Sequence, residues 1–382
     1  MNSATPEEVR QVPLEERIAA FVQLGRQFAL FGEGQPWPGH SCGINEVEYA
    51  SFEEAVRRAK SRNGWFTEEN VRHMLRSISA MLEPARLNAW LAHYPDLVGS
   101  TTSQKRFGAG AQTTDNRQLT ISAVGLITAG NIPLVGFHDL LCVLLSGHRA
   151  RLKISNDDAG LTNAVLGLLR LIAPDLAARV SIADQKLGEV HAVIATGSNN
   201  TARYFEHYFG HLPRIIRKNR TSVAVLDGTE SEQELEALGE DLFRYFGLGC
   251  RNVGKLFIPQ DFDLDRVFKA IYPWERIGNH NKWANNYDYH KAIWLMDRVP
   301  LLENGFVLFR EDTGLHSPLG SIYYERYAKR SAVDAVLIER AGEIQCIVGH
   351  GHVAFGSAQC PGPQDYADGV DTMRFLVGLA TG

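Results

Sequence analysis

The segment "LTISAVGLITAGNIPLVGFHDLLCVLLSGHRARLKIS", from Leu119 to Ser155, begins the repeat that decides the fold. Its apolar runs predict a strand in "LTISAVGLITAG", a helix in "FHDLLCVLLSG" and a second strand in "ARLKIS". The alternation continues to Gly228 with the helix "LTNAVLGLLRLIA", the strand "VHAVIAT", the helix "NTARYFEHYF" and the strand "TSVAVLDG". This order is typical of a parallel sheet that is covered by helices on both faces.

Helices precede these strands, and a second unit follows them. Apolar residues recur at spacings of three and four in "LEERIAAFVQLGRQFALF" and "NVRHMLRSISAMLEPARLNAWLA", which predicts helices near the N-terminus. After the amphipathic helix in "ESEQELEALGEDLFRYFG", strands such as "VGKLFIP", "GSIYYERY" and "IQCIVGH" continue the α/β pattern less regularly. The sequence therefore predicts an α/β protein with two domains, residues 1–240 and residues 241–382.

Composition limits the functions that the chain can have. It is 382 residues long, and its content of 45% hydrophobic and 22% charged residues is ordinary for a globular protein. Five scattered cysteines without a CxxC pair argue against a disulfide framework or a zinc cluster, and favour a reducing compartment. The acidic N-terminus lacks the pattern of a secretory signal, and no apolar run approaches the roughly 18 residues of a membrane span. We expect a cytoplasmic protein with no membrane span and no metal.

Charge argues against nucleic acid as a partner. The formal net charge is -5 and the isoelectric point is near 6.2, whereas phosphate binding needs a basic face. The basic run "RIIRKNR", from Arg214 to Arg220, is the local exception, and we interpret it as a solvated edge.

Three loops follow predicted strands and should gather at one edge of the sheet, where ligands bind in open α/β folds. In "TAGNIPL", Pro133 restricts the backbone, so that Asn131 is held at the strand end either as an oxyanion donor or as an ordinary turn residue. In "RLKIS", Lys153 and Ser155 either reach a ribose or phosphate or lie on the surface. In "ATGSNNTARYF", Gly197 and Ser198 open a helix, as a diphosphate site or a plain turn would.

Cys250 stands apart from the other cysteines. It follows Gly247-Leu248-Gly249 in "YFGLGCRNVGKLF", whereas Cys142 lies inside an apolar run. The neighbouring Arg251 and nearby backbone N–H groups are expected to lower its pKa and favour a nucleophilic thiolate, the alternative being a chance loop thiol.

Two histidines lie between glycines in "GHGH" near the C-terminus. His350 and His352 suit either a Cys-His pair or a metal, but no third ligand at a convincing spacing supports the metal. We therefore interpret both as polar loop residues.

The order of these motifs resembles the aldehyde dehydrogenase superfamily. Within it, "AGNIPLVGFHDLL", "RLKIS", "VIATGSNNTARYF", "GLGCRNVG" and "AQCPGPQDYADGVDT" are similar to the acyl-CoA reductase branch, the LuxC-like fatty-acid reductases. The resemblance implies a Rossmann-like NAD(P)-binding domain and an α/β catalytic domain that carries the cysteine. It also implies a homo-oligomer, with a C-terminal segment that returns either to the first domain or to the oligomer interface.

The resemblance also assigns roles to residues. Cys250 would accept the acyl group, with Asn131 and the Cys250 N–H as the oxyanion hole. Lys153 and Ser155 would meet the adenosine ribose or its phosphate, and the Gly197-Ser198 pair would meet the diphosphate.

Two departures from the wider superfamily matter. Ile216 stands where hydrolytic aldehyde dehydrogenases place a water-activating glutamate. The acid that holds the nicotinamide ribose is not clearly placed either, with Glu311 as the candidate and Asp312 as its rival.

These features predict reduction of an acyl-CoA, or another acyl thioester, to an aldehyde through an acyl-cysteine. The resemblance alone implies NADPH as the cofactor, with NADH as the alternative. Rival interpretations are a hydrolytic aldehyde dehydrogenase that uses another acid as base, and a catalytically silent partner that binds nucleotide or an acyl carrier. A cysteine hydrolase that uses His350 or His352 ranks last, because it gives Lys153 no role.

Overall fold

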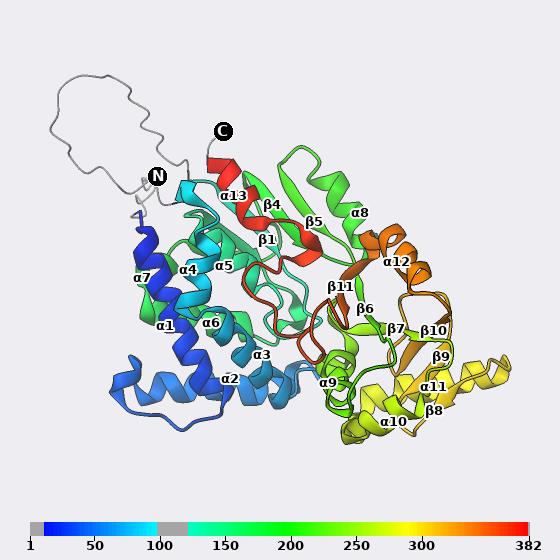
Figure 1. Cartoon of the computed structure of the whole chain (residues 1–382). Helices are drawn as coiled ribbons and strands as arrows, with labels where there is room; N and C mark the ends of the chain where they lie inside the picture. The colour runs from blue at the N-terminus through cyan, green and yellow to red at the C-terminus, as the bar shows by residue number, and fades with distance from the viewer. Residues whose placement is uncertain (1–10, 98–120, 381–382) are drawn as a thin grey trace.

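The computed structural model describes residues 11–97 and 121–380, which form two parallel-sheet units with a layer of N-terminal helices (Figure 1). The acidic N-terminal residues 1–10 and the first residues of the predicted strand "LTISAVGLITAG" lie outside the described residues. The helices of the N-terminal layer are α1 (Leu14–Gly32), α2 (Glu46–Arg62), α3 (Glu68–Met81) and α4 (Pro84–Leu91). Pro84 separates α3 from α4, because proline is tolerated in the first turn of a helix but not inside one.

The first sheet has five parallel strands in the order β3-β2-β1-β4-β5. The strands are β1 (Ala123–Ile127), β2 (Arg149–Lys153), β3 (Val180–Ile182), β4 (Ala192–Thr196) and β5 (Arg214–Arg217). The helices between them are α5 (Phe137–Leu145), α6 (Leu161–Ile172), α7 (Pro174–Ala177) and α8 (Asn199–Tyr208). The predicted alternation of strands and helices is confirmed here, and the chain crosses from β3 past β1 to β4, which creates a ligand-binding crevice at the carboxyl edge.

The second sheet has six strands in the order β11-β6-β7-β10-β9-β8, and all neighbours are parallel except β8 and β9. The strands are β6 (Thr221–Val225), β7 (Val253–Pro259), β8 (Leu302–Glu303), β9 (Leu308–Glu311), β10 (Ser321–Tyr327) and β11 (Ile344–Val348). The accompanying helices are α9 (Glu232–Phe243), α10 (Asp265–Ala270), α11 (Asn281–Met296) and α12 (Arg330–Glu339). Because β6 pairs with β7 and β11, the chain enters the second unit just after β5, earlier than the predicted boundary between residues 240 and 241.

The C-terminal segment crosses back to the first unit. The last helix, α13 (Thr372–Ala380), packs on α5, and His148 bonds the carbonyl of Leu376 at 2.9 Å. Figure 1 shows this red helix beside the strands of the first sheet. Residues just before α13 therefore lie across the junction of the two units. None of the helices in the described ranges combines the length and apolarity that crossing a bilayer requires.

Candidate active site

A cavity of about 660 Å³ lies where the two sheets and α3 meet. Among the sequence-predicted site residues it brings together Asn131, Gly197, Ser198 and Cys250. Lys153, Ser155 and Glu311 do not line it. The sequence-predicted thiol, amide and glycine-serine turn thus share one cavity. The amide and the glycine-serine turn follow β1 and β4 at the carboxyl edge of the first sheet, whereas the thiol comes from the turn that precedes β7 in the second sheet.

Cys250 occupies the first central position of a tight turn. The carbonyl of Gly249 accepts the N–H of Asn252 at 2.9 Å, which places Cys250 and Arg251 in the middle of the turn. The Asn252 side chain anchors the turn to the preceding helix. Its Oδ1 accepts the N–H of Gly249 at 2.8 Å, and its Nδ2 donates to the carbonyls of Asp241 and Arg244. Asn252 is buried and holds the turn through three hydrogen bonds, so the turn is rigid.

The loops that carry Asn131 and Cys250 both contain strained backbone. Tyr245 and Phe246, just before the cysteine turn, have φ angles of 55° and 58°, and Leu134, after Asn131, has a φ of 51°. Such left-handed conformations cost non-glycine residues about 1–3 kcal/mol each and concentrate at functional sites. The Tyr245 hydroxyl is held by His73 Nδ1 at 3.0 Å, so the surrounding structure enforces the strained turn.

Asn131 ties the two units together at the cavity. Its Nδ2 donates to the carbonyl of Leu248 at 2.7 Å, two residues before Cys250. This bond uses one of the two amide hydrogens, and within the described chain the buried Oδ1 has no partner. The amide therefore keeps a second donor at the cavity, and its role as an oxyanion donor stays a prediction.

Burial raises the pKa of the Cys250 thiol. The backbone N–H groups of Arg220 and of Cys250 itself and the charge of Arg220 oppose this rise, while Asp368 adds to it. The expected help from Arg251 is wrong: its Nε donates to the carbonyl of Ala358, away from the thiol. The thiolate form of Cys250 is therefore stabilised mainly by hydrogen bonds from backbone N–H groups.

The turn between β4 and α8 fits a diphosphate. Ser198 caps α8, its Oγ accepting the N–H of Thr201 at 3.2 Å. A Cβ at Gly197 would lie 3.0 Å from the Thr201 side chain and 3.2 Å from the Phe205 ring. Glycine lets α8 start close to β4 without crowding these two side chains, and the first N–H groups of α8 are then available at the cavity edge.

The other predicted cofactor residues flank the cavity. Lys153 Nζ donates to the carbonyl of Gln185 at 3.0 Å. Ser155 Oγ accepts the N–H of Asp157 at 3.2 Å and packs against cavity-lining Gly130, where a Cβ would approach this oxygen to 2.7 Å. Ser155 therefore shapes the cavity wall indirectly, and the adenosine role of both side chains stays a prediction.

The ribose acid is not located by the structure. Glu311 is exposed at the end of β9, and Asp312 pairs with Arg310 at 2.7 Å and accepts the N–H of Gly314. The residues that line the cavity do not include Glu311 or Asp312. A role for either acid in binding the nicotinamide ribose stays a prediction.

The interpretation of "RIIRKNR" as a solvated edge is wrong for Arg217. Its side chain is only 7% exposed, lines the cavity, and forms an ion pair with buried Asp139 on α5. Arg217 Nη2 also donates to Thr372 Oγ1 at 2.9 Å, which joins β5 to the C-terminal helix. Alternation along β5 places Ile215 and Arg217 on one face, which was the only available signal that Arg217 points inward.

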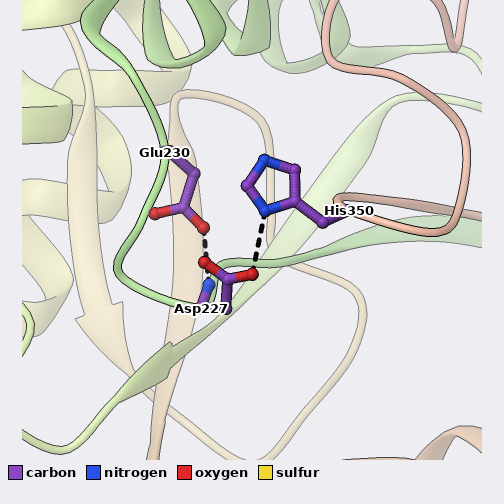
Figure 2. A group of neighbouring side chains, drawn as sticks. All are labelled: Asp227, Glu230 and His350. Atoms are coloured by element: carbon purple, nitrogen blue, oxygen red, sulfur yellow. Dashed lines mark hydrogen bonds and ion pairs between the residues drawn. The ribbon is translucent and has the colours of Figure 1, made fainter.

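His350 lies in a separate surface cluster (Figure 2). Its Nδ1 is 2.8 Å from Asp227 Oδ2 and its Nε2 is 3.0 Å from Glu234 Oε1, and these hydrogen bonds raise the pKa of His350 to about 9. Asp227, Glu230 and His350 bring ligand atoms within 4.8 Å of one another, but the carboxylate of Glu230 already accepts two backbone N–H groups. Since neither His350 nor His352 lines the cavity, the cysteine hydrolase interpretation has no Cys-His pair.

Comparison with solved structures defines the class of the fold. The chain superposes on aldehyde dehydrogenase 21 from Physcomitrella patens, in complex with succinate, with a TM-score of 0.62, at 11% identity, over 97% of this chain and 85% of that one. An oxidoreductase from Marinobacter aquaeolei gives a TM-score of 0.61, at 13% identity, over 89% and 74%. An NAD+ complex of a Mycobacterium tuberculosis aldehyde dehydrogenase gives 0.57, at 12% identity, over 88% and 73%. The protein has the aldehyde dehydrogenase fold.

The family follows from the sequence profile. The model of the acyl-CoA reductase (LuxC) family matches residues 49–266, more than half of the chain, so the chain belongs to this family. No curated protein matches it. Membership of this family supports an oxidoreductase that acts on aldehydes or acyl-CoA.

Proposed function

We propose that the protein reduces an acyl-CoA, or another acyl thioester, to an aldehyde through an acyl group held on Cys250. One observation carries this proposal: the thiol faces a cavity with a carboxamide and a diphosphate-type turn, and within the described chain no glutamate lines that cavity. A covalent thioester that water attacks slowly is what a reductase needs, because the acyl group must survive until hydride arrives.

The backbone supports nucleophilic attack at Cys250. Thiolate adds to the thioester carbonyl, the new carbon–sulfur bond replaces the bond to CoA, and CoA leaves as a thiolate that takes a proton from solvent. The Gly249 carbonyl points to Asn252, so across this planar trans peptide the N–H of Cys250 points the opposite way. That N–H and the free hydrogen of the Asn131 amide are the donors for the developing oxyanion.

The cofactor would be held mainly by the first unit, with one acid from the second. Gly197 and Ser198 would bind the diphosphate, Lys153 and Ser155 the adenosine end, and Glu311 or Asp312 the nicotinamide ribose. A bound NADPH, or NADH, supplies the hydride that reduces the acyl group to aldehyde and restores the Cys250 thiolate. A homo-oligomer and a cytoplasmic location stay predictions.

A hydrolytic aldehyde dehydrogenase is the second candidate, because the cavity is not free of acids. Its acidic residues are Asp139, Asp157, Asp365 and Asp368. Asp368 is close enough to influence the Cys250 thiol, but it pairs with Arg220 at 3.2 Å. Burial raises the pKa of Asp368, which would suit a general base, but Arg220 competes with water for its carboxylate, and this competition favours the reductase.

Two measurements test the proposal. Incubation with acyl-CoA but no reductant should leave a thioester that mass spectrometry maps to Cys250 and that Cys250→Ser lacks. An adduct on Cys142 or Cys346 instead would remove the assignment.

The second measurement supplies a long-chain aldehyde and NADP+, with and without CoA. A stoichiometric burst followed by steady turnover only on adding CoA is expected, because deacylation by water lacks the 10²- to 10⁴-fold help of a positioned base. Steady release of carboxylic acid without CoA, abolished by Asp368→Asn, would instead establish the hydrolytic enzyme.

A further inference from the structure

Ser222, on β6, lies beside the catalytic turn. It is fully buried, and its Oγ makes three contacts: 3.0 Å to the carbonyl oxygen of Cys250, 3.2 Å to the backbone nitrogen of Cys346 and 3.1 Å to the Cys346 Sγ. These contacts join the cysteine turn to β11, the neighbouring strand of the second sheet.

The direction of each of these bonds follows from the number of donors. A serine hydroxyl has one hydrogen and two lone pairs. The carbonyl of Cys250 can only accept, so it takes the hydroxyl hydrogen, and the N–H and S–H of Cys346 then occupy the two lone pairs. Burial raises the pKa of Cys346, with partial opposition from Arg251, so its S–H remains a donor. The Ser222 hydroxyl therefore has no freedom to rotate.

The two peptides that flank Cys250 are thus fixed by different partners. The turn bond to Asn252 fixes the peptide before the cysteine, and Ser222 fixes the peptide after it. With both peptides held, the Cys250 N–H and Sγ keep a constant orientation toward the cavity.

We propose that Ser222, locked by Cys346, is a positioning residue that holds the Cys250 peptide in the orientation needed for acyl transfer. This inference rests on the proposed role of Cys250 as acyl acceptor. Ser222 itself touches neither substrate nor cofactor, and it acts through the carbonyl of Cys250. Its loss should let the turn rotate and weaken the backbone donors that hold the thiolate.

Alkylation of Cys250 by iodoacetamide tests the inference without requiring turnover, so its failure is distinct from failure of the reductase proposal. The rate is followed by mass spectrometry at Cys250 across a pH series in the full-length protein. Ser222→Ala should slow alkylation up to about ten-fold at neutral pH, the equivalent of one hydrogen bond, and should move the midpoint of the pH profile upward. Arg220 and Asp368, the charged groups that act on this thiol, are unchanged in the variant.

Ser321→Ala is the matched control. Ser321 is a buried serine of the same sheet whose Oγ donates to the carbonyl of Pro318 at 2.7 Å, far along the order of strands from β11. Both variants should lower the melting temperature by similar amounts, but only Ser222→Ala should change the Cys250 profile. Equal profiles in the two variants would overturn the inference.

A double-mutant cycle tests the part of Cys346. Cys346→Ala should slow alkylation by a smaller factor than Ser222→Ala, and Cys346→Ser, which keeps a donor, should recover most of that loss. The double variant Ser222→Ala/Cys346→Ala should be no slower than Ser222→Ala alone, because both changes act through one hydroxyl. Effects that multiply in the double variant would show that Cys346 does not act through Ser222 and would overturn the proposal.

Discussion

Asp241 offers a sharp test of the electrostatics around the site. It lies on α9 and is buried, and its two carboxylate oxygens accept the N–H groups of Gly356 at 2.7 Å and Ala358 at 2.9 Å. Residues 359–368 directly follow Gly356 and Ala358, and several of them line the cavity. Burial raises the pKa of Asp241 to about 7, against the opposing effect of the two N–H groups.

The sign of the pH effect follows from this shift. An acid whose pKa is higher in the folded state than in the unfolded state binds more protons when folded, so its contribution to stability falls as pH rises between the two values. Here the ordinary value is 3.8 and the folded value is about 7. The difference of about three units corresponds to a loss of about 4 kcal/mol in the free energy of unfolding between about pH 4 and pH 7, with a plateau above.

Asp241→Asn removes this titration. Asparagine resembles the protonated acid, so near pH 4 the variant should lose only about 1–3 kcal/mol, from one mismatched hydrogen bond. From pH 4 to pH 8 the stability of the variant relative to wild type should then improve by about 4 kcal/mol, because only wild type must bury a charge. Urea unfolding at a series of pH values measures this difference.

Glu236→Gln, on the exposed side of the same helix, is the control for loss of a negative charge. Its stability relative to wild type should change little over the same range. A pH-independent difference between wild type and Asp241→Asn would refute the reasoning, since it would mean that the folded protein does not shift this carboxyl group.

Two further predictions concern the cofactor turn and the buried ion pair. Gly197→Ala should weaken cofactor binding in a titration by at least several-fold, because the added Cβ would press on Thr201 and Phe205 and move α8. The rate of Cys250 alkylation should stay unchanged. An unchanged affinity for the cofactor would contradict the proposed binding of diphosphate by this turn. Asp139→Asn should cost about 3–5 kcal/mol in chemical unfolding, because Arg217 stays buried without its ion-pair partner and keeps only the weaker attraction of Asp368. Asp139→Leu with Arg217→Met should cost much less, and equal losses would show that Asp368 compensates the charge.

Local patterns in the sequence predicted most of the elements but not how they associate. Strands such as β1 and β4 are short apolar runs between turn residues, so their existence could be read directly. The strand β6 has the same character, yet it joins the second sheet. Which sheet accepts a buried parallel strand is decided by contacts distant in sequence, so the residues of β6 alone could not assign it to the second sheet.

The sequence likewise predicted some residues of the candidate site and missed others. Asn131 and Gly197 could be placed together because each follows a strand at one edge of the first sheet, and only the family resemblance brought Cys250 to the same site. Ser222 and Asn252 could not, because their importance lies in hydrogen bonds to the backbone of the cysteine turn. Arg217 was misplaced because a charged residue on an edge strand is usually solvated, and only its partner Asp139 explains its burial.

The donors around Cys250 suggest why a thiol with a raised pKa suits this reaction. The N–H of Cys250 lowers the pKa of its own thiol and is also the backbone donor proposed for the oxyanion. As the bond to the acyl carbon forms, negative charge moves from sulfur to oxygen, and this N–H can follow it without reorganisation of the turn. A lower thiol pKa would also make the sulfur a weaker nucleophile. A turn fixed on both sides, by Asn252 and by Ser222, therefore stabilises the transition state more than the resting thiolate. Changes that loosen the turn should lower the rate of acyl transfer more than the affinity for acyl-CoA.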